Sequence, residues 1–148
     1  MELLPDDALE LDRQVCFALA VASRSVIGAY RPILEPLGLT HPQYLTMLAL
    51  WEHAPLRFGE IAEMLRLDPA TLSPIIKRLE HSGLIEREPV AGDERTFQLV
   101  LTEQGSALRE QALSVPPAVI ARLGLPVERL MALRDELVVI IEAVERGQ

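Results

Sequence analysis

Hydrophobic residues recur at helical intervals in two neighbouring segments near the middle of the chain. Over 58–65 the apolar positions fall on one side of a helix and the charged positions on the other. Asp68-Pro69 then combines a capping side chain with a residue that suits a first helical turn, so a second helix is predicted over 69–81. Ser82-Gly83 ends that helix.

The pattern then changes from helical to alternating. Residues 84–89 and 96–101 alternate like two strands, joined by a turn at 90–94, and a short strand is expected near position 56. The order helix, turn, helix and hairpin predicts a winged helix-turn-helix, a mainly α fold with a small β-wing. A small α+β domain with merely solvated charges is the alternative interpretation.

The second predicted helix has two different faces. Leu72, Ile75, Ile76 and Leu79 form its inward side. Small polar groups near its start and two adjacent cations suit a helix that enters a DNA major groove. Pro74 removes one helical hydrogen bond, so a separate or kinked first turn is expected. The predicted DNA-binding residues are Ala70, Thr71, Ser73, Pro74, Lys77 and Arg78 in this helix, with Arg87 and Arg95 in the wing.

The chain before this unit predicts two helices. One starts at about residue 7 and is disturbed at Tyr30-Arg31-Pro32, and residues 33–39 form a connector. Thr40 is a plausible cap for the next helix, over 42–53, which is apolar nearly all round and is expected to be buried.

The chain after the wing predicts a helix over 102–113, an interruption at Val115-Pro116-Pro117 and a last helix after Pro126. The last helix carries a broad apolar band that needs a partner, and a second copy of the chain is the simplest one. We therefore expect one domain over 1–148, with dimerisation helices at 8–39 and 103–146 around a DNA-binding part at 40–102.

The net negative charge of the chain qualifies the DNA-binding interpretation. The chain of 148 residues is 49% hydrophobic, enough for one core, but its net charge is −8. Residues 56–102 contain six Lys or Arg against eight Asp or Glu, a net charge of −2. Because non-specific DNA affinity comes mainly from phosphate neutralisation, binding is expected to depend on a few placed cations, doubled in a dimer.

Composition also narrows the class of protein. The lone cysteine, Cys16, excludes an internal disulfide framework and fits a reducing cytoplasm. The sequence predicts no signal peptide, no membrane span, no metal site and no cofactor. There is no nucleophile with a recognisable base and orienting group except the pair Cys16 and His41, so an enzyme is not expected.

Two groups of motifs carry a family resemblance. The segment LRLDPATLSPIIKRLEHSGLIER, followed by GDER and LTEQG, resembles the MarR family of bacterial transcription regulators. QVCF, with AYRPILEPLGLTHPQYLTMLALWEH, resembles the single-cysteine, organic-hydroperoxide-sensing branch of that family. The similar segments span about 11–117. The resemblance implies a homodimeric repressor on an inverted-repeat operator of double-stranded DNA.

In that branch a reactive cysteine is hydrogen-bonded by two tyrosines. Cys16 and Tyr30 match the cysteine and the first tyrosine, whereas His41 replaces the second and Ala20 replaces a further aromatic residue. An imidazole near a thiol favours the thiolate, which is the form that oxidises, although His41 also suits a capping or surface position. Oxidised Cys16 has four routes: a mixed disulfide with a low-molecular-weight thiol, a sulfenamide, over-oxidation or a bond to another chain.

Three other interpretations stay open at this point. Cys16 can be a small buried hydrophobic residue, since free cysteine is among the most buried residue types. A regulator of the same type can instead respond to a small aromatic or phenolic ligand between the dimerisation helices and the DNA-binding part. A protein-interaction module without DNA function is the interpretation that the acidic charge favours.

Overall fold

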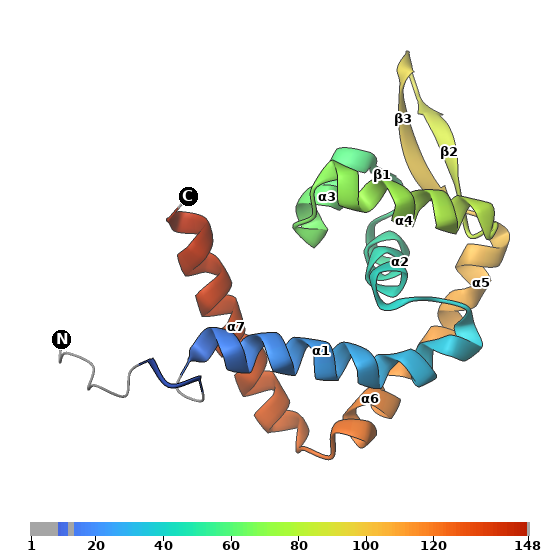
Figure 1. Cartoon of the computed structure of the whole chain (residues 1–148). Helices are drawn as coiled ribbons and strands as arrows, with labels where there is room; N and C mark the ends of the chain where they lie inside the picture. Colours follow the sequence, from blue (N-terminus) through green and yellow to red (C-terminus); the bar gives the residue numbers. More distant parts are fainter. Residues whose placement is uncertain (1–8, 12–13, 148) are drawn as a thin grey trace.

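The computed structural model describes residues 9–11 and 14–147 and is mostly helical, with one small sheet (Figure 1). Its elements in chain order are α1 (Val15–Leu34), the short 3₁₀ helix η3 (Glu35–Leu37), α2 (His41–His53), β1 (Leu56–Arg57), α3 (Phe58–Leu65), α4 (Pro69–His81), β2 (Ile85–Val90), β3 (Asp93–Leu101), α5 (Glu103–Ala112), α6 (Val115–Leu123) and α7 (Val127–Arg146). No helix in the described ranges is long and apolar enough to cross a membrane.

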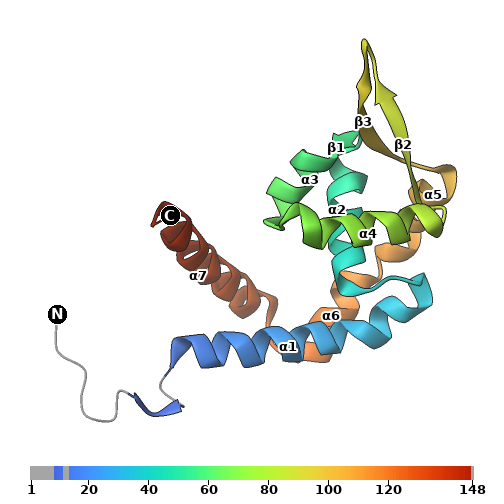
Figure 2. The same ribbon diagram turned by 45° about the horizontal axis from the view of Figure 1, so that its top comes forward.

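A head is formed by α2, α3, α4 and the sheet. The sheet has the strand order β1-β3-β2 and is antiparallel throughout, with Leu56 opposite Leu99 and Ile85 opposite Leu101. The hairpin of β2 and β3 projects beyond the helices as a wing (Figures 1 and 2). This arrangement confirms the winged helix-turn-helix fold.

The core of the head lies under α4. Leu72, Ile75, Ile76 and Leu79 are all buried, as the helical spacing predicts. They share one apolar cluster with Met47 and other buried residues of α2, α3 and β3. The expectation that α2 is buried nearly all round is wrong on one side. Leu45 and Leu48 stay 37% and 40% exposed, while Gln43 and Thr46 are buried.

Two helices start where the sequence predicts, after Thr40 and after Asp68, but only Thr40 caps its helix with a side-chain hydrogen bond. Thr40 Oγ1 accepts from Gln43 N–H (3.4 Å), and Gln43 Oε1 accepts from Thr40 N–H (2.9 Å), which makes a capping box. Asp68 occupies the N-cap position of α4, but its side chain makes no capping hydrogen bond. The Pro69 that follows already suits the first turn by its fixed backbone angle and missing N–H.

Prolines interrupt the helices less than the sequence predicts. The separate first turn expected at Pro74 is absent, since α4 runs unbroken over Pro69–His81. The exposed Ala70, whose carbonyl loses a partner to Pro74, leaves that group accessible to water. In the same way α1 continues through Pro32 to Leu34. The interruption expected at Val115-Pro116-Pro117 is present, since α5 ends at Ala112, and the two prolines lie in the first turn of α6, where N–H groups lack helical partners anyway.

Two boundaries differ further. The wing turn is shorter than 90–94, because β3 begins at Asp93 and Gly92 turns the chain with a φ of +83°. The helix start expected near residue 7 lies outside the described residues, and α1 begins at Val15.

Two hydrogen bonds connect the start of α5 to the end of α4 and to α2, and a third caps α5 itself. Thr102 Oγ1 donates to Gly83 O (2.6 Å) and accepts from Gly105 N–H (3.0 Å), while Trp51 Nε1–H donates to Gly105 O (2.9 Å). The backbones are so close here that a Cβ on Gly105 would lie 2.0 Å from Leu84 O.

We therefore expect Gly105→Ala to lower the free energy of unfolding by about 1–3 kcal/mol, the usual cost of overpacking. Urea unfolding followed by circular dichroism measures this change. The matched control is Gly59→Ala in α3, where nothing lies within 4 Å of the added Cβ. A Gly105→Ala protein as stable as the control would contradict the close approach.

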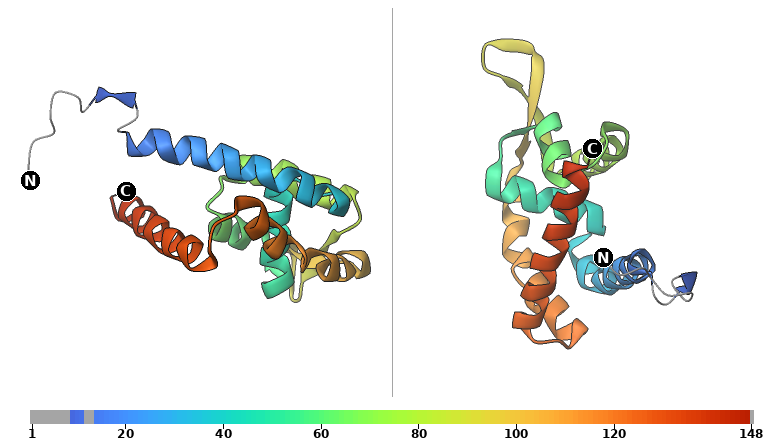
Figure 3. Two further views of the ribbon diagram at one scale, coloured as in Figure 1. Left: turned by 90° about the horizontal axis from the view of Figure 1, so that it is seen from below. Right: turned by 90° about the vertical axis from the view of Figure 1, so that its left-hand side faces the viewer.

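Helices α1, α6 and α7 lie outside the head. Figures 2 and 3 show α7 as an arm that stands away from α2–α4. None of the residues of α7 is buried, although the helix is described over its whole length. Its exposed side chains include Met131, Leu133, Val138, Val139, Ile140, Ile141 and Val144.

Candidate nucleic-acid interface and thiol site

The face of α4 opposite the core is open to solvent (Figure 2). Burying the apolar stripe of α4 turns the predicted DNA-binding side chains outward. Ser73 is half-buried, and the other five are exposed: Ala70, Thr71, Pro74, Lys77 and Arg78. Within the described part of the chain, neither Lys77 nor Arg78 has an ion-pair partner, so both charges are available to a polyanion.

Near the tip of the wing, Asp93 organises the backbone beside Arg95. Asp93 Oδ2 accepts from Thr96 Oγ1 (2.6 Å), and Oδ1 accepts from Arg95 N–H (3.0 Å). These two hydrogen bonds, in that order of size, lower the pKa of Asp93. The exposed Arg95 guanidinium has no partner among the described residues. Asp93 therefore fixes the backbone of the turn and leaves the Arg95 guanidinium without a partner among the described residues.

Arg87, the remaining predicted DNA-binding residue, is engaged within the protein. Its Nε donates to both carboxylate oxygens of Glu80 (3.0 and 3.2 Å), and its Nη2 donates to Oε1 (3.1 Å). Its guanidinium carbon also lies 4.5 Å from the centre of the Phe97 ring. Arg87 thus differs from Lys77, Arg78 and Arg95, which have no ion-pair partner among the described residues.

Arg57 is a candidate that sequence reasoning missed. It is exposed on β1, borders the same hollow as Arg95, and its charge contributes to the lowered pKa of Asp93. The two-residue strand that places Arg57 opposite Gln98 is too short to give an alternating pattern. The sequence therefore held no signal for this position.

Cys16 lies in the first turn of α1 and is exposed. The interpretation of Cys16 as a buried hydrophobic residue is therefore wrong for the single chain. The first turn of a helix also presents unpaired N–H groups, which favour negative charge nearby.

Tyr30 and His41 lie together at the other end of α1. Their ring centres are 4.9 Å apart in an edge-on arrangement, and Tyr44 lies 5.9 Å from Tyr30. Burial lowers the pKa of His41 and raises those of Tyr30 and Tyr44. The lowered pKa favours the neutral imidazole form of His41, which can accept one hydrogen bond and donate another.

One chain does not bring Cys16 to this ring cluster. Fourteen residues of the continuous helix α1 separate Cys16 from Tyr30, which corresponds to about 21 Å at 1.5 Å per residue. A site that contains Cys16, Tyr30 and His41 requires two chains.

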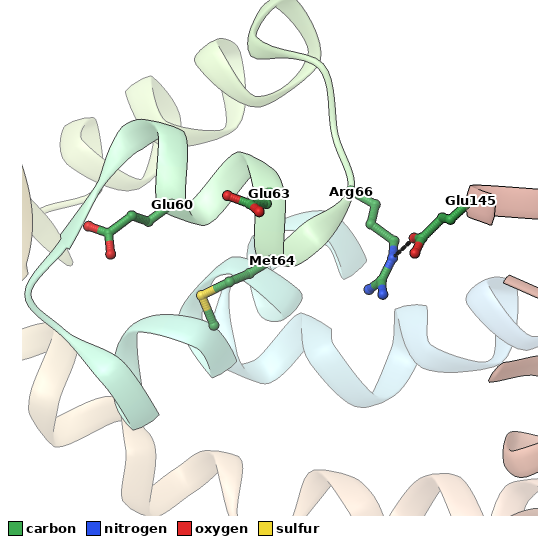
Figure 4. Close-up of a pocket in the computed structure, with 5 residues that line it drawn as sticks. All are labelled: Glu60, Glu63, Met64, Arg66 and Glu145. Atoms are coloured by element: carbon green, nitrogen blue, oxygen red, sulfur yellow. Dashed lines mark hydrogen bonds and ion pairs between the residues drawn. The ribbon is translucent and has the colours of Figure 1, made fainter. Parts of the chain in front are cut away.

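Two hollows border the head. A cavity of about 310 Å³ lies between α2, α5 and α6 and is lined by Tyr44, Leu48, Trp51, Glu52, Arg109, Ala112, Leu113 and Pro116. Tyr44 is buried, and its hydroxyl has no hydrogen-bond partner within the described ranges. A second, charged hollow of about 620 Å³ separates α3 from the end of α7 (Figure 4). There Arg66 donates to Glu145 and links the head to the arm.

No cluster of three or more His, Cys, Asp or Glu side chains suited to a metal ion occurs in residues 9–11 and 14–147. The chemistry that the described residues offer is therefore polyanion binding at α4 and the wing, and thiol chemistry at Cys16.

Comparison with known proteins gives a family. A sequence model of the MarR family matches residues 39–97. The chain is 38% identical over 140 residues to the organic hydroperoxide resistance transcriptional regulator of Bacillus subtilis (strain 168), covering 95% of each protein.

Solved structures agree. Reduced AbfR bound to DNA, a protein of Staphylococcus epidermidis, matches with a TM-score of 0.75 and 31% identity over 95% of this chain and 99% of that one. CouR bound to a 23-mer DNA duplex matches with a TM-score of 0.82 and 27% identity over the same shares. CouR from Rhodococcus jostii RHA1 bound to p-coumaroyl-CoA matches with a TM-score of 0.73 and 28% identity, over 87% of this chain and 92% of that one.

Proposed function

Because this chain belongs to the MarR family of transcriptional regulators, we propose that it is a homodimeric repressor that releases its operator when organic hydroperoxides oxidise Cys16. In this proposal residues 40–102 form the DNA-binding part, and 8–39 and 103–146 form the dimerisation helices. The protein acts in the cytoplasm on double-stranded DNA with an inverted-repeat sequence.

The proposal that the chain binds DNA rests on one observation, the outward face of α4. Short side chains at its start leave room for base edges, and Lys77 and Arg78, which have no ion-pair partner among the described residues, follow four and five residues after Ser73, about one turn later, where they can reach phosphates. Arg95 on the wing supplies a further cation beside this face. The solved DNA complexes of AbfR and CouR, which share this fold, support the same use.

The apolar surfaces of α1 and α7 support a two-fold dimer. Val15, Phe17 and Val21 on α1 are exposed, and the apolar band of α7 has no cover within one chain. Pairing two chains through these helices buries both surfaces and holds two copies of α4 about one DNA turn apart. Pairing also provides the second chain that a site containing Cys16, Tyr30 and His41 requires.

The exposed thiol of Cys16 and the similarity to the Bacillus subtilis regulator support the redox signal. The Cys16 thiolate attacks the terminal oxygen of a hydroperoxide, the O–O bond breaks, and the alkoxide leaves and takes up a proton. A low-molecular-weight thiol then attacks the resulting sulfenic acid at sulfur and releases water, leaving a mixed disulfide. The added bulk at the dimer interface shifts the two α4 helices off their half-sites.

A second candidate signal rests on the cavity beside α2. Its lining combines the buried Tyr44, whose hydroxyl has no hydrogen-bond partner among the described residues, with Trp51 and the cation Arg109, which suits a small aromatic or phenolic ligand. The CouR complex with p-coumaroyl-CoA supports this alternative. Such a ligand releases DNA without any change at Cys16.

Operator binding tests the proposal. Purified protein is titrated against the DNA upstream of its own gene and against a shuffled duplex, at several salt concentrations. Sequence-selective binding that weakens with rising salt is expected. Equal binding to both duplexes, or none, would leave the chain as an interaction module without specific DNA function.

Arg95→Ala gives a sharper prediction at the wing. We expect weaker binding to operator and shuffled DNA alike, with a salt slope smaller by about 0.9 for each lost phosphate contact. Changes at Thr71 or Ser73 should instead alter the preference between sequences. Fluorescence anisotropy at four salt concentrations measures the slope, and unchanged operator affinity in Arg95→Ala would remove the wing from the interface.

A further inference from the structure

Arg87 joins three elements that otherwise meet only at the base of the wing. It lies on β2, its carboxylate partner Glu80 lies in the last turn of α4, and the Phe97 ring beneath its guanidinium lies on β3. The Nε and Nη2 donors, which form one edge of the guanidinium, act on one carboxylate, and the flat guanidinium face rests on the aromatic ring. This is a set of contacts that an arginine makes and a lysine does not.

Apart from β1, which pairs with β3 at Leu99 and Gln98, the wing has few other contacts that set its angle. From Glu86 to Pro89 every residue of β2 is exposed, and β3 has a single buried residue, Leu99. Phe97 is the apolar side chain beyond Leu99 that packs against the core cluster. The position of the wing tip relative to α4 therefore depends on what holds Phe97 and β2 against the end of that helix (Figure 2).

We propose that Arg87 is a positioning residue that holds the wing at a fixed angle to α4, and that it does not contact DNA. This inference rests on the proposed DNA binding, because the angle matters only if α4 and Arg95 reach one duplex together. Arg87 thereby lowers the cost of ordering the wing when DNA binds.

Charge supports this role. The Glu80 carboxylate takes up the positive charge of Arg87, so the pair presents no net charge to a phosphate. If Arg87 turned to DNA, it would leave the Glu80 carboxylate, whose side chain is 26% exposed, without its partner beside a polyanion. Lys77, Arg78 and Arg95 meet no such obstacle, since their charges are unpaired.

Glu80→Gln distinguishes a positioning role of Arg87 from a DNA contact, because the two roles predict opposite changes in operator affinity. If Arg87 holds the wing, removing the carboxylate weakens operator binding by about fivefold, as does Arg87→Gln. If Arg87 contacts DNA, Glu80→Gln frees it and removes a repulsive charge, so binding becomes tighter. Tighter binding would overturn the inference.

Three further measurements sharpen the test. The double variant should bind no more weakly than either single variant, because both remove one interaction. The salt slope of Arg87→Gln should stay at the wild-type value, whereas loss of a phosphate contact lowers it by about 0.9 per contact. Arg87→Lys should fail to restore affinity, whereas a phosphate contact tolerates lysine.

Glu88→Gln is the matched control, because it removes the same charge from an exposed neighbour on β2 that has no ion pair among the described residues. It should bind operator at least as tightly as wild type. Weakening of this control equal to that of Glu80→Gln would overturn the inference.

A readout without DNA separates this inference from the proposed function. Hydrogen exchange of the β2 and β3 amides should be faster in Glu80→Gln than in Glu88→Gln. Faster exchange in a protein whose wild type ignores operator DNA would support the contact while refuting the regulator. Equal exchange in a protein that binds operator would refute the positioning role alone.

Discussion

One equivalent of an organic hydroperoxide with a small thiol is expected to release the wild-type protein from operator DNA and to leave Cys16→Ser bound. The serine hydroxyl has nearly the shape of the thiol but cannot form a sulfenic acid or a mixed disulfide. Coupling between an effector site and a binding site typically changes affinity 5- to 150-fold, so we expect wild-type affinity to fall on the order of 10- to 100-fold. A gel shift at fixed protein concentration measures it.

Mass spectrometry of the same samples identifies the modification at Cys16. Reduction with dithiothreitol should restore binding if a mixed disulfide is the product. Release of Cys16→Ser by the oxidant would refute the thiol mechanism. Wild-type protein that ignores the oxidant, yet is released by an aromatic acid or phenol, would favour the ligand that the cavity at Tyr44 suits.

A charge in the apolar band of α7 is the second large change. We expect Leu133→Glu to raise the dimer dissociation constant on the order of 100-fold, because association would bury two carboxylates where two leucines now stand exposed. Operator affinity should fall by a similar factor, because a monomer holds only one half-site. Sedimentation velocity and anisotropy on the same preparation measure both quantities.

Ala132→Glu is the control for this change, since it adds the same charge one residue away on α7. On a helix that step turns the side chain by 100°, away from the band formed by Leu133, Ile140 and Val144. Dimerisation should stay near the wild-type value in the control. A Leu133→Glu protein that remains dimeric would place the interface elsewhere.

The inward and outward faces of α4 could be predicted from the sequence, because helical period alone decides them once the residues differ sharply in polarity. The apolar Leu72 and Ile76 could be placed only on the inward face, and the charged Lys77 and Arg78 only on the outward face. The boundaries of the wing followed less well, since Val90 and Asp93 extend the strands into a segment with no alternating pattern.

Other features depend on neighbours that are distant in sequence. The partner of Arg87 is seven residues away and its aromatic contact ten, across an element boundary in each case. A count of cations therefore could not separate Arg87 from Arg95. The separation of Cys16 and Tyr30, by contrast, follows from the sequence positions alone once α1 is known to be continuous, because the rise of a helix per residue is fixed.

Because α7 stands as an arm outside the head, the stability of the protein has two contributions, one within a single chain and one that requires pairing. The core of the head, which includes Leu34 of α1 and Val115 and Val119 of α6, is completed within one chain, so its contribution to the free energy of unfolding does not depend on protein concentration. In the proposed dimer the N-terminal half of α1 and the whole of α7 gain cover from a second copy, and mass action then sets how much of the population is paired. A regulator built this way responds to its own concentration. Below a threshold the chain is a folded monomer, and only above it does a dimer present two DNA-binding parts.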